Sequence, residues 1–225
     1  MKRIILIATL LASMLPLSAQ TISSAEWAHK YRYAGANAEV TKTSKRPKAV
    51  LMGDSITDGW AQKHDVFFTE NNLQGRGISG ECTAQMLLRF RQDVVALRPK
   101  YVVILAGVND IALNTGYSTM DDIIGNIKAM CEIAKANGIK PVLCTATPAD
   151  GIPWRPEVTA VVEQVKELNR RITEYAKAKR YPLVDYWTAL ADKGGGFPRN
   201  LAPDGIHPNV DGYLIMEDLL LKKLK

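Results

Sequence analysis

The pattern that most constrains the fold of this chain is an alternation of short β-branched runs with longer segments of helical period. Four runs predict strands: Ala49 to Met52, Tyr101 to Ala106, Pro141 to Ala146 and Leu183 to Tyr186. A fifth run, at 73–78, is a weaker candidate. Strands that alternate with helices are typical of parallel sheets, because a crossover helix joins each strand to the next. The sequence therefore predicts an open, doubly wound sheet with helices on both faces.

Four later segments carry apolar residues at helical spacing. The first lies between Thr83 and Pro99, the second follows Ser118, the third is expected to begin at Pro156, and the fourth follows Pro208. Ligands of doubly wound folds bind beyond the carboxyl ends of the strands. Residues that directly follow the predicted strands are therefore the first candidates for a functional site.

The first nineteen residues have the layout of a cleavable secretory signal. Lys2 and Arg3 precede an apolar stretch from Ile4 to Leu17, and the small residue Ala19 precedes Gln20. This layout predicts export to the periplasm or the cell exterior, and no later run reaches the ~20 apolar residues of a membrane span. We expect three parts: a signal peptide over 1–19, an N-terminal extension over 20–47 and one main domain over 48–225.

The charge and cysteine content argue against several classes of partner. The 29 Lys and Arg residues against 23 Asp and Glu give a mild formal net charge of +6, and the one basic run, 41–48, is typical of a solvated connection. Nucleic-acid binding would need a larger basic face with aromatic partners. The three cysteines, Cys82, Cys131 and Cys144, allow at most one disulfide and lack metal-binding spacing. We expect no nucleic-acid partner, no stable membrane insertion and no metal site, and the oligomeric state stays open.

The segment GRGISG at 75–80 matches the GxGxxG dinucleotide fingerprint. That fingerprint should follow a firm strand and precede an acidic residue by about 20 positions. Here the preceding TENNLQ is mostly polar, and the nearest suitable acid, Asp93, falls inside a predicted helix. Glycines that shape a tight strand-to-helix turn are the favoured interpretation.

Only three histidines are present, and His207 is the best candidate for a catalytic base. His29, His64 and His207 show no HxxxH spacing, which makes a zinc site built by the protein improbable. In DGIHP, Asp204 precedes His207 by three residues, so its carboxylate can hold one ring nitrogen while the other faces a substrate. A surface turn in which Asp204 binds the backbone explains this spacing equally well.

Ser55 and Asn109 each follow a predicted strand. Ser55, in GDSITDG, is either a nucleophile or the cap of the next helix. The segment is not a GxSxG elbow, because position 57 is Thr. Asn109, in GVND, can aim its amide at a reacting oxygen or begin an Asx turn.

Taken together, GDSITDG, GISG, GVND and DGIHP stand in the order and rough spacing of the four blocks of the GDSL or SGNH hydrolase family. The chain resembles the secreted bacterial type of that family from about 49 to 207. The resemblance implies a three-layer α/β/α sandwich of flavodoxin-like SGNH type, with about five mostly parallel strands. It also implies a serine esterase chemistry that needs no metal or organic cofactor.

The resemblance gives each motif residue a role. It implies that Ser55 is the nucleophile, His207 its general base and Asp204 the residue that orients His207. The Ser55 and Gly80 N–H groups and the Asn109 side-chain amide then form the oxyanion hole. The chemistry is consistent, because a hydroxyl is a poor nucleophile until a base takes its proton.

Loop residues are candidates for contacting the substrate. Trp60, Trp154, Arg155, Phe197 and Arg199 lie near strand ends or in long loops, where they suit a sugar ring or a polar head group; ordinary packing explains each at least as well. No extended apolar helix can act as a lid, which favours short acyl groups, most of all O-acetyl groups on carbohydrate, cleaved through an acyl-enzyme. The alternatives are a lysophospholipase or thioesterase-like enzyme for longer chains and a catalytically silent carbohydrate-binding module.

Overall fold

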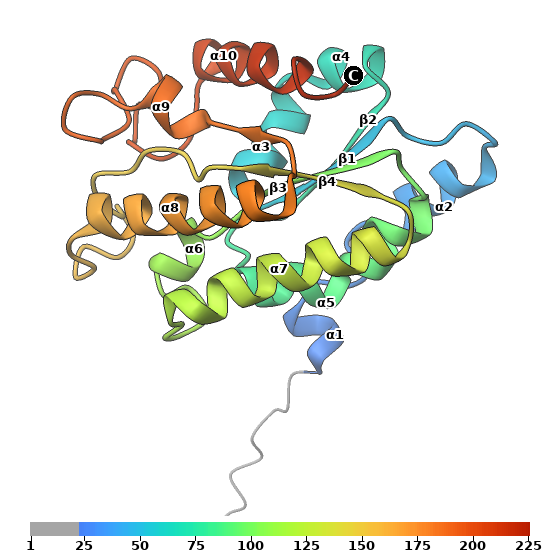
Figure 1. Ribbon diagram of the computed structural model, residues 1–225, viewed down its shortest axis with the longest axis horizontal. Helices are drawn as coiled ribbons and strands as arrows, with labels where there is room; N and C mark the ends of the chain where they lie inside the picture. The colour runs from blue at the N-terminus through green and yellow to red at the C-terminus, as the bar shows by residue number, and fades with distance from the viewer. Residues whose placement is uncertain (1–22) are drawn as a thin grey trace, which may run out of the picture.

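A computed structural model describes residues 23–225 and contains a five-stranded sheet in the order β2-β1-β3-β4-β5 (Figure 1). The strands are β1 (Ala49–Gly53), β2 (Leu73–Gly77), β3 (Tyr101–Leu105), β4 (Lys140–Cys144) and β5 (Leu183–Val184). All neighbouring strands run parallel. Each strand falls within a predicted run or extends it by one residue, and the three-layer α/β/α architecture with flavodoxin-like strand order is confirmed.

Helices cover both faces of the sheet, which explains why the central strands β1 and β3 are buried along their whole length. Successive side chains of a strand point to opposite faces. Met52 and Ile104 therefore belong to one hydrophobic core, and Leu51 and Val103 belong to the other.

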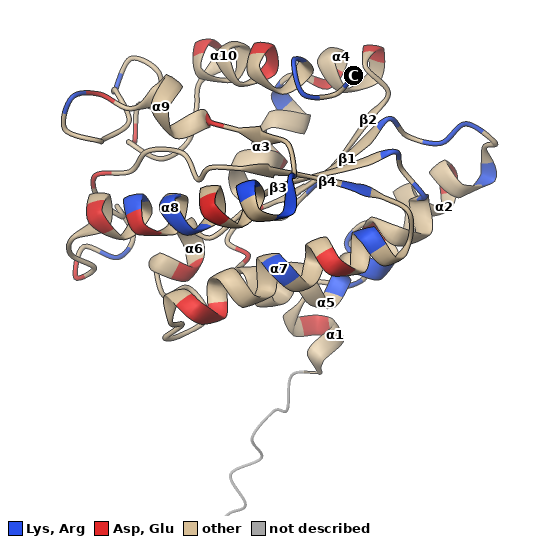
Figure 2. Cartoon of the chain, in the orientation of Figure 1, with Lys and Arg blue, Asp and Glu red and all other residues tan. Residues whose placement is uncertain are grey.

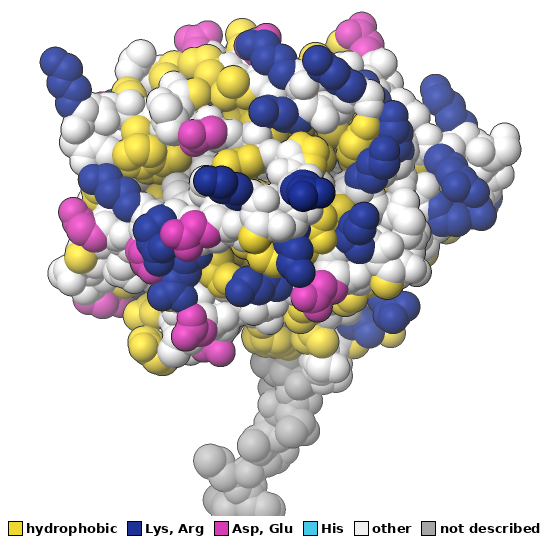
Figure 3. Space-filling model, viewed as in Figure 1, with side chains coloured by type: hydrophobic (Ala, Val, Ile, Leu, Met, Phe, Trp, Pro, Cys, Tyr) yellow, Lys and Arg dark blue, Asp and Glu magenta, His cyan; other side chains and the backbone are white. Residues whose placement is uncertain are grey.

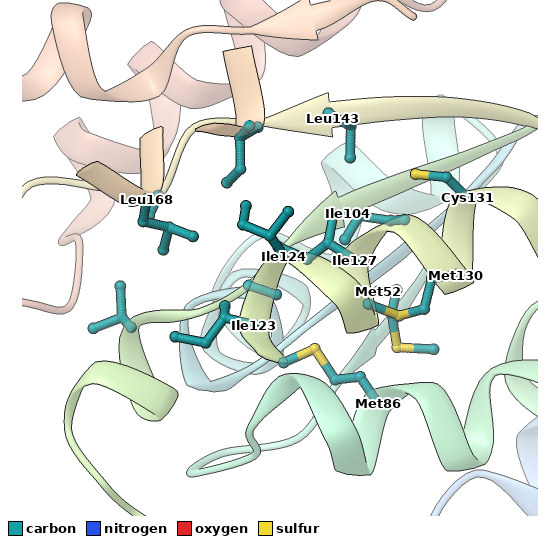
Figure 4. Close-up of a cluster of buried hydrophobic side chains, with 14 of the residues drawn as sticks. Met52, Met86, Ile104, Ile123, Ile124, Ile127, Met130, Cys131, Leu143 and Leu168 are labelled. Atoms are coloured by element: carbon teal, nitrogen blue, oxygen red, sulfur yellow. The ribbon is translucent and has the colours of Figure 1, made fainter. Parts of the chain in front are cut away.

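One core lies under three long helices. These are α5 (Thr83–Asp93), followed by the 3-10 helix η1 (Val95–Leu97), α7 (Met120–Ala136) and α8 (Val161–Lys179). Figure 4 shows Met86 of α5, Ile127 of α7 and Leu168 of α8 gathered on the side of β4 to which Leu143 points. The helices of this layer pack on one face of β1 and β3, strands after which candidate site residues lie.

The opposite face is covered by four other helices (Figure 1). These are α3 (Ser55–Lys63), α4 (Asp65–Glu70), α9 (Tyr186–Leu190) and α10 (Val210–Leu221). Trp60 lies at the centre of this layer, with its ring stacked on Phe67 at 5.7 Å and on Tyr213 at 5.6 Å between centroids. Aromatic packing of this kind joins α3, α4 and α10.

The predicted starts of two helices have different outcomes. The capping box at α7 is present, because Asp122 N–H donates to Thr119 Oγ1 at 3.1 Å and Thr119 N–H donates to Asp122 Oδ2 at 2.8 Å. The prediction that the third helix begins at Pro156 is wrong, since α8 begins at Val161. Ala160 has a φ of 53°, in the left-handed region, so the helical path cannot extend back through it.

Two helices of the N-terminal extension, α1 (Ser24–Trp27) and α2 (Ala34–Lys42), lie against the body of the domain. The Tyr33 hydroxyl donates to the carbonyl oxygen of Gly77 in β2. Gln85 Nε2 of α5 donates to the carbonyl oxygen of Trp27 at 2.6 Å. The described part of the extension is therefore docked on the domain, whereas the predicted signal peptide lies outside the described residues.

The outer face of α8 carries acidic and basic side chains in alternation, as Figure 2 shows. Arg170 pairs with Glu167 at 2.7 Å and with Glu174 at 2.5 Å. Figure 3 likewise shows basic side chains interspersed with apolar and acidic ones on this side of the molecule. Exposed pairs of this kind add little to stability. None of the described helices has the length and hydropathy needed to cross a membrane.

Candidate active site

The candidate site lies where the strand order reverses. β1 and β3 are neighbours in the sheet, and the chain leaves β1 toward one edge and β3 toward the other. Ser55 directly follows β1, and Asn109 lies in the short helix α6 (Val108–Ile111) that follows β3. The loops after β3 and β4 lie on the left in Figure 1, at the ligand-binding edge of a doubly wound sheet.

The turn after β1 leaves the Ser55 hydroxyl without a capping role. Asp54 is the N-cap of α3, because its Oδ1 accepts the N–H of Ile56 at 3.0 Å, and Ser55 is the first helical residue. Gly53 is required just before it, since a Cβ there would lie 2.1 Å from Thr57 Oγ1. Asp54 is buried, and this burial raises the pKa of its carboxyl group to about 6.

Ser55, His207 and Asp204 form one hydrogen-bonded line. Ser55 Oγ lies 2.8 Å from His207 Nε2, although 152 positions separate the two residues in the sequence. His207 Nδ1 lies 2.6 Å from Asp204 Oδ2. The structure thus brings together the three residues predicted to act as nucleophile, base and orienting acid.

The second oxygen of Asp204 binds the backbone of its own turn. Asp204 Oδ1 accepts the N–H groups of Ile206 at 2.9 Å and of His207 at 2.8 Å. Gly205 allows this turn with a φ of 82°. The two hydrogen-bonding arrangements expected for Asp204, one to a ring nitrogen of His207 and one to the backbone of its turn, therefore occur together. Burial raises the pKa of Asp204, but the hydrogen bonds from His207 and Ile206 outweigh that effect and hold the pKa below its ordinary value.

Asn109 is buried, with 3% of its surface exposed, and its amide is held by a neighbouring loop. Asn109 Nδ2 donates to the carbonyl oxygen of Glu81 at 3.0 Å. Gly80 precedes Glu81 and has a φ of 81°, a conformation that favours glycine. The bond to Glu81 therefore fixes the Asn109 side chain beside the Gly80 loop.

The other glycines of GRGISG have a packing role. A Cβ on Gly75 would lie 2.6 Å from the Ala61 side chain, and a Cβ on Gly77 would lie 2.2 Å from the backbone nitrogen of Asp58. Both positions face α3, so these glycines allow β2 and α3 to approach closely. The side of Gly80 is open, with Asn114 Nδ2 at 3.9 Å as the nearest atom.

A buried ionic network beneath the site was not predicted from the sequence. Arg89 is fully buried, and it donates to Glu81 Oε2 at 2.6 Å and to Asp93 Oδ2 at 2.9 Å. It also donates to the carbonyl oxygen of Gly53 at 3.2 Å, next to the turn that carries Ser55. The available signal was the position of Arg89, three residues after Met86 on the apolar face of α5.

Asp110 is a second buried acid that the sequence did not single out. Thr83 donates to it twice, from its hydroxyl to Oδ1 at 2.6 Å and from its N–H to Oδ2 at 3.0 Å. Burial raises the pKa of Asp110, and the bonds from Thr83 oppose that shift. These hydrogen bonds from Thr83 to Asp110 therefore join the first residue of α5 to α6.

Two predicted substrate residues, Trp60 and Phe197, lie in the core, so the prediction that they contact the substrate is wrong. Each has 1% of its surface exposed, and both belong to the core on the α10 side of the sheet. Neither can touch a substrate without unpacking that core. Aromatic residues near strand ends are equally common in cores, and the sequence alone does not distinguish the two environments.

The other three predicted substrate residues lie at the surface. Trp154 is 42% exposed, and the centroid of its ring lies 6.1 Å from that of the His207 ring, at an interplanar angle of 28°. Arg199 pairs with Asp150 at 3.1 Å, and Arg155 lies 3.5 Å from a glutamate of its own loop. Of the three, Trp154 is in contact with the Ser55–His207–Asp204 line.

A hollow of about 330 Å³ adjoins Asp204 and is lined by Asp150, Ile152, Pro156 and Arg199, among others. A larger hollow of about 620 Å³ lies between the outer faces of α7 and α8, and its lining contains none of the residues of the hydrogen-bonded line. Proximity to Asp204 makes the smaller hollow the relevant one. Within 23–225, no group of three or more His, Cys, Asp or Glu side chains is arranged to hold a metal ion.

The cysteines offer no rival nucleophile. Cys82, Cys131 and Cys144 are all buried and free. Burial raises the pKa of the Cys82 thiol to about 11 and that of Cys131 to about 12. A thiol with so high a pKa carries almost no thiolate at neutral pH.

The sequence matches the model of the GDSL-like lipase/acylhydrolase family over residues 51–215. A crystal structure of a GDSL-like lipase from Bacteroides thetaiotaomicron is 43% identical, covers 88% of this chain and 98% of its own, and superimposes with a TM-score of 0.85. An uncharacterized lipoprotein of Bacillus subtilis is 36% identical over 56% of this chain, and the match spans only 58% of that protein's length.

Two more distant relatives are named as esterases. An isoamyl acetate-hydrolyzing esterase of Saccharomyces cerevisiae is 24% identical over 77% of this chain and 74% of its own length. An acetylxylan esterase of Geobacillus stearothermophilus is 22% identical over 81% of this chain and 96% of its own length. The family match covers the segments after β1, β2, β3 and β5 that carry Ser55, Gly80, Asn109 and His207. The chain therefore belongs to the GDSL-like lipase/acylhydrolase family.

Proposed function

We propose that this protein is a serine esterase in which Ser55 attacks the ester carbonyl. The observation that carries the proposal is the 2.8 Å contact between Ser55 Oγ and His207 Nε2, continued by the 2.6 Å contact between His207 Nδ1 and Asp204. A serine within hydrogen-bond reach of a histidine that is itself oriented by a carboxylate is the arrangement that activates a hydroxyl.

The proposed reaction has two halves. His207 Nε2 takes the Ser55 proton as Oγ bonds to the carbonyl carbon, and the same nitrogen returns the proton to the departing alcohol. Water then attacks the acyl-enzyme by the same route, releasing the acid and restoring Ser55. The Asp204 carboxylate, whose pKa lies below its ordinary value, stays ionised near neutral pH and stabilises the protonated imidazole in both halves.

The proposed oxyanion hole consists of the Ser55 and Gly80 N–H groups and Asn109 Nδ2. Ser55 is the first residue of α3, where helix N–H groups lack intrahelical partners and favour a developing negative charge. Gly80 has open space on its Cα, so a substrate can approach its backbone. Fixed donors of this kind usually make one of the largest contributions to acyl transfer.

We propose short acyl groups, above all O-acetyl groups on carbohydrate, as the substrate class. The two esterase relatives support this choice, because their names specify acetate and acetylxylan. The exposed Trp154 ring beside His207 also suits the apolar face of a sugar, and the hollow next to Asp204 offers room for it.

The test is hydrolysis of p-nitrophenyl esters from C2 to C12 and of acetylated oligosaccharides, with Ser55→Ala as the control. We expect activity that depends on Ser55 and peaks at C2. A peak at C8 or beyond would favour a lysophospholipase or thioesterase-like enzyme instead. Sugar binding without hydrolysis of any ester would favour a carbohydrate-binding module.

We also propose that residues 1–19 are removed on export, leaving Gln20 as the first residue. The support is the basic start and apolar stretch of this leader. Intact-mass analysis of protein secreted by a bacterial host is the test, and an uncleaved chain in the cytoplasm would contradict the proposal.

A further inference from the structure

The Asn114 side chain links three parts of the site. Its Oδ1 accepts the indole N–H of Trp154 at 2.9 Å. Its Nδ2 donates to Asn109 Oδ1 at 2.9 Å and to the carbonyl oxygen of Gly80 at 3.2 Å. Asn114 therefore joins the exposed tryptophan beside His207 to both residues of the proposed oxyanion hole that lie outside α3.

The direction of these bonds follows from groups that can act in only one way, since the Trp154 indole N–H donates and the carbonyl oxygens of Gly80 and Glu81 accept. A tryptophan Nε1–H can only donate, whereas a side-chain amide can present either its oxygen or its nitrogen. The Asn114 atom that faces Trp154 must therefore be the oxygen. Its NH2 group then faces Asn109, and the Asn109 atom that meets it must be the oxygen as well.

This direction has a consequence for Asn109. With its oxygen turned to Asn114, its NH2 group faces the opposite way, toward the carbonyl oxygen of Glu81. An amide nitrogen carries two hydrogens. Since the bond to Glu81 uses one, the second is left for an oxygen of the substrate.

We propose that Trp154 and Asn114 are positioning residues, which together keep the Asn109 amide turned so that its NH2 group faces the reacting oxygen. The proposal rests on the oxyanion role proposed above for Asn109. Neither residue needs to touch the substrate for this effect. Because Trp154 is at the surface, its N–H can be removed with little disturbance to the core.

The first test is Trp154→Phe assayed with p-nitrophenyl acetate. Phenylalanine keeps an aromatic ring beside His207 but lacks the N–H that directs Asn114. We expect kcat to fall about three- to tenfold, the effect of one neutral hydrogen bond, with KM changed less than about twofold. Tyr117→Phe is the matched control, because it removes a polar group from the loop that carries Asn114, at a residue that is 84% exposed.

A second variant, Asn114→Asp, keeps the bond that Asn114 accepts from Trp154 and removes the bonds that it donates to Asn109 and Gly80. The carboxylate still accepts the Trp154 N–H, but it cannot donate to Asn109 or to Gly80. We expect a loss in kcat at least as large as that of Trp154→Phe. A loss confined to KM would mean that this pair contacts the substrate rather than positioning Asn109, and it would overturn the proposal.

The deciding measurement is a double-mutant cycle with Asn109→Ala. If Trp154 acts through Asn109, Trp154→Phe will change kcat less than about twofold in the Asn109→Ala background. An equal loss in both backgrounds, or no loss from either Trp154→Phe or Asn114→Asp, would overturn the proposal. An unchanged kcat in Asn109→Ala alone would instead remove the oxyanion role on which the proposal rests.

Discussion

Glu217 of α10 accepts a hydrogen bond from the indole N–H of Trp60 of α3, at 3.0 Å between Nε1 and Oε1. His64 Nδ1 lies 2.7 Å from the same oxygen. Glu217 is 9% exposed, and a carboxylate so deeply buried requires such partners. The bond ties the helix that begins at Ser55 to the last helix of the chain.

Trp60→Phe should therefore reduce stability without touching the chemistry. The ring still packs on Phe67 and Tyr213, but the buried Glu217 loses a donor, which costs about 1–3 kcal/mol. Urea unfolding measures the change in the free energy of unfolding. At urea concentrations below the unfolding transition, kcat should stay at the wild-type level. Trp187→Phe is the matched control, because its buried indole nitrogen has no hydrogen-bond partner among the described residues. Equal midpoints for both variants would contradict this reading of Glu217.

Asp204→Asn should lower kcat by up to ~10⁴, because an amide can donate to His207 Nδ1 and thereby hold the imidazole in the wrong tautomer. The backbone of the turn is spared, since an asparagine oxygen still accepts the N–H groups of Ile206 and His207. Steady-state kinetics at pH 8 test this. Asp150→Asn, which alters an exposed carboxylate of the neighbouring hollow, should cost far less. Similar losses in both variants would argue against a specific role for Asp204.

Asn109→Ala should lower kcat by ~10²–10³ with little change in KM, since its amide is expected to bind the oxygen mainly when charge develops on it. Asn126→Ala is a suitable control. Its Nδ2 donates to Thr83 Oγ1 at 3.0 Å, close to the site but on α7. If both variants lose activity equally, the effect is structural rather than specific to the oxyanion hole.

Asp54→Asn should change how stability depends on pH. Burial raises the folded-state pKa of Asp54 from 3.8 to about 6, so between these values the unfolded chain ionises before the folded one. Stability from this group is present at low pH and is lost as the pH rises toward 6, by up to about 3 kcal/mol. Asparagine keeps the acceptor for Ile56 N–H but does not ionise.

The measurement for Asp54 is urea unfolding of the wild-type and variant proteins from pH 4 to pH 8. The free energy of unfolding of Asp54→Asn, relative to wild type, should rise across the lower half of this range and then level off. Taking the difference removes the contribution of the other carboxylates. A difference that stays constant with pH would mean that burial does not raise the pKa of Asp54 in the folded protein.

The sheet and the residues at its edge could be predicted because they depend on local patterns. β-branched runs mark β1 and β3, and their carboxyl ends must meet at one edge of a parallel sheet. Ser55 and Asn109, which follow these strands, were therefore expected at the same edge of the sheet. The resemblance of the four motifs to the family, in order and spacing, then predicted that His207 lies beside them.

The errors have a different origin. Pro156 is a good first residue for a helix, but the left-handed conformation of Ala160 depends on the course of the whole loop and delays the start of α8. Trp60 is an aromatic residue near a strand end, and only the packing of α10 shows that it is internal. Arg89 forms ion pairs with Glu81 and Asp93, which lie eight residues before it and four residues after it. The sequence does not show that all three side chains are buried.

The N-terminal extension contacts residues next to the candidate site, although it lies outside the segment that matches the family model. His29 Nδ1 lies 3.2 Å from Glu81 Oε1, and Tyr33 bonds to the carbonyl oxygen of Gly77. Both residues precede position 51, where the family match begins. A protein trimmed to the family boundaries would thus lose one contact with the end of β2 and one with Glu81, the residue after Gly80. The folded body of this chain therefore extends beyond the residues that match the family model.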